Sequence, residues 1–215
     1  MFPLLTMVTT RFEVNFGAFA VSISRVGIQV ESLSWLVGAG FGAALTAFVG
    51  QNFGAGKTDR IEKGFRYTAL FLTAFGLWVT AIMWFGGDII FAIFLPEHIN
   101  DPEMRRIFIA HMRIMAVCQV FANLEFAAAN AFRGKSRTIP PSVINISSNI
   151  ILVPMAYLLS LTSLGLLGIW AARSITSSLR GLIILIWYLL AERKERLANT
   201  LFNPNLPKYP DDTLQ

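Results

Sequence analysis

Long apolar runs dominate this chain and alternate with short polar connections. Five runs meet the roughly 20 residues that a membrane-spanning helix needs, and they cover 27–50, 67–91, 107–131, 139–161 and 165–190. In lipid, a spanning segment satisfies its own backbone hydrogen bonds as a helix, or else as part of a closed barrel. These runs are too long for barrel strands and do not alternate apolar with polar positions. We therefore predict an all-α, polytopic transmembrane bundle.

The two ends of the chain do not fit the spanning pattern. Residues 1–10 are apolar but too short to cross a bilayer, so they are expected to be the end of a helix whose beginning is absent. Residues 16–24 are either a connector or the start of the second helix. From Asn199 the chain is polar and carries three prolines. We expect residues 1–198 to form one transmembrane unit and 199–215 to form a cytoplasmic tail.

Composition supports the membrane assignment. Hydrophobic residues make up 54% of the 215-residue chain and charged residues 14%, whereas soluble domains carry about 25% charged residues. The net charge of +5 does not indicate a nucleic-acid partner, because the basic residues sit in short clusters between apolar runs. The single cysteine, Cys118, excludes a disulfide within the chain.

The basic clusters fall on alternate connections between the apolar runs. They are Lys57, Arg60, Lys63 and Arg66, then Arg133, Lys135 and Arg137, then Arg193, Lys194 and Arg196. Between them lie an acidic connection near residues 97–103 and an uncharged turn at 161–165. The positive-inside rule therefore predicts residues 51–66, residues 133–138 and the C-terminus in the cytoplasm, with the chain in the cell membrane.

Glu125 is the acid that lies deepest in an apolar run. A carboxylate at membrane depth costs at least ~2.5–3.5 kcal/mol, so it normally faces a cavity or a partner. It is predicted to bind an ion or substrate, either as a reversible proton site or as a sodium site with oxygens from Asn123 and Asn130. The alternative is a structural acid held in an ion pair.

A polar stripe interrupts the run 139–161. Its members are Asn145, Ser147, Ser148 and Asn149. The stripe either lines an aqueous cavity or bonds to neighbouring helices. Asn145 and Asn149 are therefore candidate ion- or substrate-binding residues.

Other charged residues in the apolar runs favour structural roles. Arg173 and Arg180 are seven residues apart and share a helix face; for both, and for Arg113, pairing or snorkelling is favoured over ligand binding. Asp88 is expected to be an interfacial structural acid. His98 and His111 are too isolated to indicate a metal site.

Two groups of glycines are associated with the run 27–50, one in its middle and one at its end. Gly38, Gly40 and Gly42 indicate close helix packing, with a transport hinge as the alternative. The segment 50–58 ends in GKT, but Gln51 occupies the position where a phosphate-binding loop requires glycine. We interpret the segment as a tight turn at a helix end.

Catalytic signatures are absent from the sequence. It contains no HExxH, GxSxG or CxxC motif and no close pair of carboxylates within an apolar run. We therefore expect no enzyme activity, no catalytic residues and no metal or organic cofactor.

Three segments resemble, in order, the second half of multidrug and toxic compound extrusion (MATE) transporters. Residues 28–64 contain the most specific match, VGQNFGAG. Residues 125–160 begin EFAAANAFRGKSRT, and residues 165–181 read GLLGIWAARSITSSLRG. The motif positions that carry the resemblance are Gly50, Gln51, Asn52, Gly54, Gly56, Arg133 and Gly134.

The resemblance implies a fold and an activity. MATE transporters have twelve helices in two six-helix lobes and expel mostly cationic, amphipathic drugs in exchange for Na⁺ or H⁺. The chain resembles the C-terminal lobe, beginning inside the seventh helix, so a fragment is expected, with the N-terminal lobe, the lipid bilayer and a drug as partners. By order, Glu125 falls in the tenth helix, about one turn from the coupling aspartate of one branch; other branches place the coupling acid in the N-terminal lobe.

Two alternatives stay open. A lipid-linked oligosaccharide flippase of the same superfamily would carry cationic residues in its cavity for pyrophosphate groups, and the helix faces of Arg113, Arg173 and Arg180 would discriminate. A half-size protein that does not transport and serves as a scaffold is the other alternative.

Overall fold

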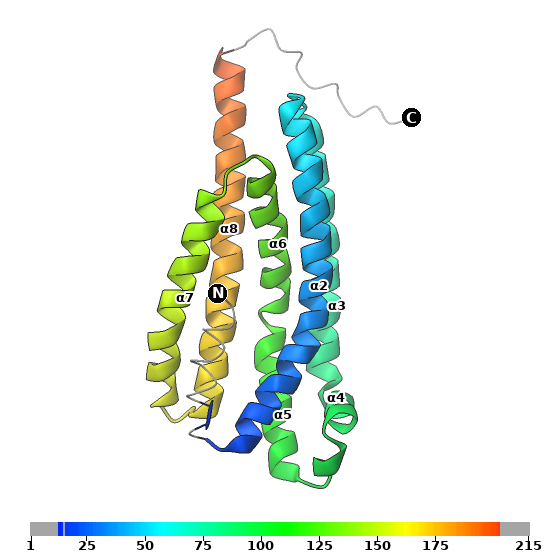
Figure 1. Ribbon diagram of the computed structural model, residues 1–215, viewed down its shortest axis with the longest axis vertical. Helices are drawn as coiled ribbons and strands as arrows, with labels where there is room; N and C mark the ends of the chain where they lie inside the picture. The colour runs from blue at the N-terminus through cyan, green and yellow to red at the C-terminus, as the bar shows by residue number, and fades with distance from the viewer. Residues whose placement is uncertain (1–12, 15, 203–215) are drawn as a thin grey trace.

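The computed structural model describes residues 13, 14 and 16–202. These residues form an elongated bundle that is helical throughout apart from its turns (Figure 1). The helices are α2 (Ala18–Gly54), α3 (Thr58–Phe85), α4 (Gly87–Phe94), the short 3-10 helix η1 (Pro96–His98), α5 (Pro102–Ala116), α6 (Gln119–Gly134), α7 (Ile139–Ser160) and α8 (Leu166–Phe202). Predictions for residues 1–10 and for most of the tail lie outside the described residues.

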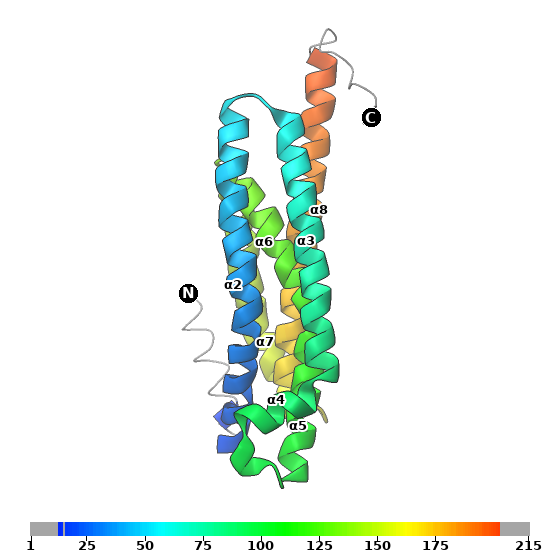
Figure 2. The same cartoon turned by 90° about the vertical axis from the view of Figure 1, so that its right-hand side faces the viewer.

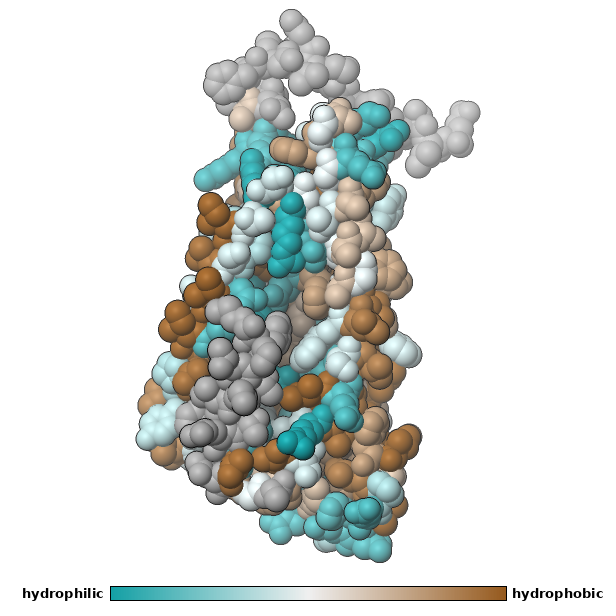
Figure 3. All heavy atoms as spheres, in the orientation of Figure 1, coloured by the Kyte–Doolittle hydropathy of each residue, from teal (hydrophilic) through white to brown (hydrophobic). Residues whose placement is uncertain are grey.

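Five helical stretches in the described part of the chain are long and apolar enough to cross a membrane. They are Phe19–Gly54, Thr58–Phe85, Pro102–Gly134, Ile139–Ser160 and Leu166–Ala198. Figure 3 shows hydrophilic residues gathered at both ends of the molecule and hydrophobic residues along its flanks. The predicted all-α transmembrane bundle is confirmed.

Several helix ends differ from the predicted ranges. Residues 18–24 begin α2 rather than forming a connector, and α8 continues to Phe202 instead of ending near residue 190. The apolar run 67–91 is not one helix, because α3 ends at Phe85 and the chain turns at Gly86 into α4. For α8 the reason is that apolarity marks only the part of a helix in the membrane, whereas the helix continues into water as long as its backbone hydrogen bonds persist.

The predicted span 107–131 begins earlier and is interrupted. It starts at Pro102, where the Asp101 side chain caps α5 by accepting hydrogen bonds from the backbone N–H groups of Glu103 and Met104, both at 3.0 Å. The regular helix breaks at Val117 and Cys118, between α5 and α6. The two short helices together form one membrane span.

Helix α6 lies at the centre of the bundle. It packs against α2, α3 and α8, while α7 packs mainly on α8 (Figures 1 and 2). One apolar cluster surrounds Phe108 and Trp170, towards the end of the bundle that carries α4. A second surrounds Phe132 and Tyr188, towards the opposite end. Buried polar side chains of α2, α6 and α8 include Glu31, Asn123 and Ser174.

Two of the three predicted packing glycines lie against α6. A Cβ on Gly38 would lie 2.5 Å from the Phe126 ring, and one on Gly42 would lie 2.3 Å from Asn130 Nδ2. The α2–α6 approach therefore depends on their missing side chains. Gly40 differs, because a Cβ there would meet no atom within 4 Å.

The three basic clusters lie at one end of the bundle. The turn between α2 and α3, the turn between α6 and α7, and the far part of α8 all point the same way (Figure 1). The turn between α7 and α8 and the segment around α4 lie at the opposite end. The architecture therefore fits the alternation of basic connections, and which end faces the cytoplasm stays a prediction.

Candidate functional site

A cavity of about 240 Å³ lies between α2, α5, α6, α7 and α8. Its apolar wall includes Ile28, Trp35, Met115, Phe126 and Leu152. Its charged and polar lining residues are Glu31, Glu125, Arg133, Asn145, Asn149, Arg173, Thr176, Ser177 and Arg180. Mainly apolar walls with a few convergent polar groups are typical of small-molecule sites.

Glu125 and Arg180 form one ion pair of the cavity. Arg180 Nε of α8 donates a hydrogen bond of 2.7 Å to Glu125 Oε2 of α6. Both side chains are less than a fifth exposed. The acid that the sequence placed at membrane depth is thus charge-paired, and its proposed ion- or substrate-binding role stays a prediction.

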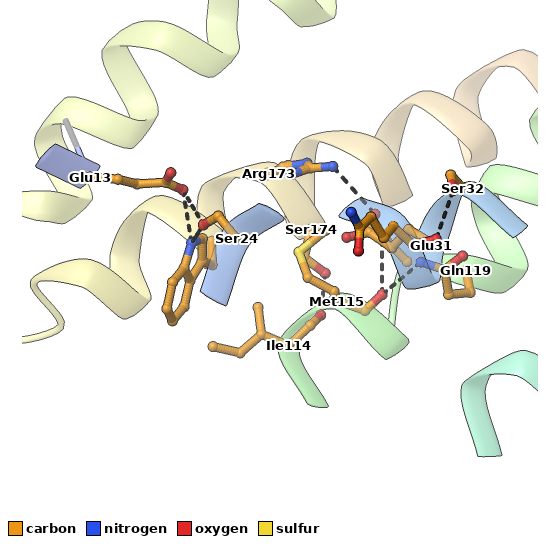
Figure 4. A network of polar contacts seen from close by, with 12 residues as sticks. Glu13, Ser24, Glu31, Ser32, Ile114, Met115, Gln119, Arg173 and Ser174 are labelled. Carbon is orange, nitrogen blue, oxygen red and sulfur yellow. Dashed lines mark hydrogen bonds and ion pairs between the residues drawn. The ribbon is translucent and has the colours of Figure 1, made fainter. Parts of the chain in front are cut away.

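Glu31 and Arg173 form a second ion pair, which joins α2 to α8. Arg173 Nη2 of α8 lies 3.4 Å from Glu31 Oε2 of α2, and Glu31 is 1% exposed (Figure 4). The guanidinium also lies over the Trp35 ring, 5.9 Å from its centroid. Glu31 Oε1 has no hydrogen-bond partner among the described residues.

Sequence reasoning did not single out Glu31. It lies four residues into the predicted run 27–50 and therefore looks like a residue of the helix end. The true helix begins at Ala18, which places Glu31 more than three turns inside it. Recognising residues 18–24 as helix would have applied the same membrane-depth argument to Glu31 as to Glu125.

The pairing prediction is confirmed for Arg173 and Arg180. Both line the cavity from α8 and both hold a glutamate. Arg113 lies outside the cavity, exposed, with its guanidinium 5.9 Å from the Trp84 ring centroid. Asp88 forms an exposed ion pair with Arg105 at 2.7 Å, in keeping with a structural interfacial acid.

The four predicted asparagines divide into two pairs. Asn145 and Asn149 line the cavity, and Asn149 Nδ2 donates a 2.9 Å hydrogen bond to Asn145 Oδ1. For these two asparagines, the structure therefore supports the alternative that the polar stripe lines a cavity. Ser148 is buried and Ser147 is exposed.

Asn123 and Asn130 lie at the contact between α6 and α2. Asn123 Nδ2 donates to Ser34 Oγ at 3.0 Å, and Thr46 Oγ1 donates to Asn130 Oδ1 at 3.1 Å. Neither asparagine is among the lining residues of the cavity. The structure therefore does not group them with Glu125, and a sodium site built from all three has no geometric support here.

The two glycine motifs meet in space. A Cβ on Gly134 would lie 2.6 Å from Val49 Cβ and 2.8 Å from the Thr46 carbonyl oxygen. A Cβ on Gly50 would lie 3.4 Å from the Gly134 carbonyl oxygen. The FRG segment of α6 thus packs directly on the VGQ segment of α2.

The predicted glycine-rich turn follows α2. Gly56 has φ +68°, a left-handed conformation that favours glycine. The Lys57 backbone N–H donates to the Asn52 carbonyl oxygen at 2.8 Å, and the Asn52 side chain bonds to the Phe48 carbonyl oxygen. Gln51 is exposed, and a Cβ on Gly54 would meet no atom within 4 Å. The segment closes a helix, as the turn interpretation requires.

A buried lysine at the basic end escaped sequence reasoning. Lys135 is 4% exposed, and its Nζ donates to Glu192 and, at 2.9 Å, to Glu195 of α8. Arg137 pairs with Glu195 as well. In the sequence Lys135 looks like a solvated loop charge. Its partners Glu192 and Glu195 lie 57 and 60 positions away, so no local pattern indicates the ion pairs.

A second polar network lies near the opposite end. Ser24 Oγ donates to Glu13 Oε1 at 2.6 Å, and Trp170 Nε1 donates to the same oxygen at 3.0 Å (Figure 4). His111 is buried beside it, with its ring 4.3 Å from the Trp170 ring. Among the described residues, no group of three or more histidine, cysteine or acidic side chains is arranged to hold a metal ion.

Comparison with known proteins decides the family. The MatE family model matches residues 1–158. The chain belongs to the MATE family of transporters. The match confirms the resemblance to the family; which lobe the chain corresponds to stays a prediction.

Curated relatives of this MATE chain are multidrug resistance proteins. It is 28% identical over 186 residues to a probable multidrug resistance protein NorM of Thermotoga maritima, a match that covers 86% of the chain and 39% of the relative. It is 24% identical over 134 residues to a probable NorM of Aromatoleum aromaticum, covering 62% of the chain and 28% of that protein. The chain spans about two fifths of the length of the first relative.

Solved MATE structures share the fold. A MATE structure in the bent conformation superposes with a TM-score of 0.83 at 17% identity, covering 92% of this chain and 43% of that one. The straight conformation gives a TM-score of 0.81 with 91% and 43% coverage at 17% identity. An inward-facing MATE transporter gives 0.75 at 16% identity, with 90% and 46% coverage.

Proposed function

We propose that this MATE chain forms the C-terminal lobe of an ion-coupled exporter of small amphipathic molecules. The observation that carries the proposal is the cavity among α2, α5, α6, α7 and α8, whose wall joins aromatic side chains to two partly buried glutamate–arginine pairs. Ionisable groups within a membrane protein are rare and mark ion or substrate pathways. The names of the NorM relatives support export of drugs.

The second lobe is part of the proposal. The cavity of about 240 Å³ lies just below the roughly 300–1,000 Å³ of typical ligand sites. The solved MATE chains are about twice as long as the part that this chain covers. We infer that an N-terminal lobe closes the site and that the two lobes expose it alternately to the two sides of the membrane.

Ion coupling would act through the glutamate–arginine pairs. In the observed arrangement Arg180 holds Glu125 and ties α8 to α6. Binding of H⁺ or Na⁺ to Glu125 would neutralise the carboxylate and weaken that attraction. Loss of the pair would let α6 and α8 separate, so the ion would change the shape of the cavity as well as its charge.

Glu125→Gln tests the coupling proposal in cells that express the whole gene encoding this chain. We expect at least a tenfold loss of ion-dependent drug efflux, because glutamine can neither bind the ion nor hold Arg180 by charge. Asp88→Asn is the matched control, since Asp88 forms an exposed ion pair outside the cavity. Efflux with unchanged ion dependence in Glu125→Gln would overturn the coupling role.

A lipid-linked oligosaccharide flippase is the second candidate function. The observation that favours it is that Arg133, Arg173 and Arg180 all line the cavity, whereas Arg113 lies outside it. A flippase would expose an anionic lipid head group to these guanidinium groups. Flipping of a fluorescent polyprenyl diphosphate in proteoliposomes would favour the flippase; drug efflux without lipid flipping would favour the exporter.

A further inference from the structure

The charges of the cavity do not match a simple site for cations. Three arginines and two glutamates line it, so the described lining carries a formal charge of +1. Neither glutamate is free, because Arg173 contacts Glu31 and Arg180 contacts Glu125. Within the described lining, both negative charges that a cationic substrate could use are thus already paired with arginines.

A cation that entered would have to compete with a tethered arginine. Arg180 belongs to α8, which packs against α6, so its effective concentration at Glu125 far exceeds that of a dissolved drug. Displacing it would leave one buried guanidinium unpaired and raise the charge of the cavity from +1 to +2. Leaving a largely buried guanidinium unpaired is unfavourable, so a cationic drug that displaces Arg180 is opposed, and one that leaves the pair intact meets no free acid in the described lining.

Arg133 supplies the surplus positive charge. Its side chain is exposed and its Nη1 donates a 3.1 Å hydrogen bond to Asn130 Oδ1, and none of the ion pairs among the described residues joins it to an acid. It lines the same cavity as the paired arginines. A guanidinium offers a planar fork of donors that fits the oxygens of an acidic group.

The apolar wall completes the chemistry of the site. Trp35 of α2 and Phe126 of α6 line the cavity together with Leu152 of α7. Aromatic and aliphatic side chains would bury a ring system or a hydrocarbon body. A ligand with both an acidic group and an apolar body meets complementary surfaces on each part.

Building on the proposed export function, we propose that the preferred substrate of this lobe is an amphipathic molecule with an acidic group, an organic anion or a zwitterion, bound by Arg133 and Arg180. Its carboxylate, sulfonate or phosphate oxygens take up the free donors of Arg133 and of the guanidinium of Arg180. An anion with a single negative charge brings the described lining from +1 to 0. Arg133 and Arg180 are thus the specificity-determining residues of this cavity.

Two dyes with one skeleton test the inference. 8-Anilinonaphthalene-1-sulfonate carries a sulfonate, and N-phenyl-1-naphthylamine is the same ring system without it. Binding of both is measured by fluorescence on the protein from the whole gene, purified into nanodiscs, with empty nanodiscs as the blank. We expect the wild-type protein to bind the sulfonate at least tenfold more tightly than the neutral dye. Equal affinity, or tighter binding of the neutral dye, would overturn the inference.

Substitutions that remove a positive or a negative charge from the cavity should change the dye preference in opposite directions. Arg133→Gln and Arg180→Gln should each lower the sulfonate-to-neutral preference about tenfold, since a hydrogen bond to a charged group is lost. Glu125→Gln should raise it and weaken ethidium binding. Arg133→Gln leaves no acid unpaired, so it remains informative if Arg180→Gln does not fold. Arg113→Gln, outside the cavity, is the control, and an equal drop there would contradict the assignment.

Two further measurements distinguish the type of acidic ligand and test the export function independently of the inference. Farnesyl diphosphate that displaces the sulfonate dye where dodecanoate does not would indicate a lipid diphosphate; the reverse would indicate a soluble amphipath. Displacement by neither would overturn the inference. Sulfonate binding without efflux of any dye would remove the export function and keep the inference. Efflux of ethidium by a protein that does not prefer the sulfonate dye would overturn the inference and keep the export function.

Discussion

At the scale of single residues, the ion pairs show how a charge is kept at membrane depth. Glu125 and Glu31 each obtain a guanidinium from α8, and the two arginines stand seven residues apart on one face of that helix. A charged side chain at this depth costs at least ~2.5–3.5 kcal/mol when alone. The pairs remove much of that cost and place both acids on the cavity wall.

Gly134→Ala tests the contact between the two motifs. Its new Cβ would lie 2.8 Å from the Thr46 carbonyl oxygen and 2.6 Å from Val49 Cβ, so α2 and α6 must move apart. We expect a loss of stability of about 1–3 kcal/mol, measured as a lower melting temperature in detergent. Gly40→Ala is the control, because its Cβ would meet no atom within 4 Å. An equal effect of the two substitutions would contradict the packing role.

At the scale of elements, the buried Lys135 ties the turn between α6 and α7 to α8. The distal part of α8 carries Glu192 and Glu195, which both accept hydrogen bonds from Lys135 Nζ. Arg196 of the same part pairs with Glu62 of α3. The extension of α8 beyond its predicted end at residue 190 is thus an element that holds three segments together at the basic end of the bundle.

Lys135→Met tests this junction. Methionine keeps the length of the side chain and removes the charge, which deprives Glu192 of its ion-pair partner and leaves Glu195 with Arg137 alone. We expect a loss of up to about 3 kcal/mol, below the range for fully buried pairs because the glutamates are partly exposed. Lys194→Met, on an exposed position of the same helix, is the control. Thermal unfolding in detergent that is unchanged for Lys135→Met would exclude the junction.

At the scale of the whole molecule, the bundle has two chemically different ends and a cavity between α2, α5, α6, α7 and α8. The basic clusters share one end, and the segment from α4 to η1 lies at the other. Figure 3 shows hydrophilic residues also along the hollow between the helices. The arrangement is that of a membrane bundle with an internal polar site.

Thiol labelling tests the predicted orientation. Ala55→Cys, in the turn after α2, and Asn100→Cys, in the turn before α5, introduce exposed thiols at opposite ends. The native Cys118 is buried and gives little background. A membrane-impermeant maleimide should label Asn100→Cys in intact cells and Ala55→Cys only in inverted vesicles. The opposite labelling pattern would reverse the positive-inside assignment.

The sequence by itself determined the spans and the motifs. Runs of apolar residues predict membrane helices because lipid leaves a backbone few other ways to satisfy its hydrogen bonds. The glycine turn after α2 and the family motifs are local as well, so they could be found by spacing alone. The ends of α3 and α8 could not be found in this way, because α3 stops inside an apolar run and α8 continues beyond the point where hydropathy falls.

Only the tertiary structure decided which charges meet. Glu125 and Arg180 are 55 positions apart, and Glu31 and Arg173 are 142 apart. The same sequence would allow these acids to be free ion sites, and Asn123 and Asn130 to join Glu125. The rotation of each helix about its axis sets which side chains face the cavity, and that rotation is fixed by packing against neighbours such as Gly38, Gly42 and Gly134 on the α2–α6 contact.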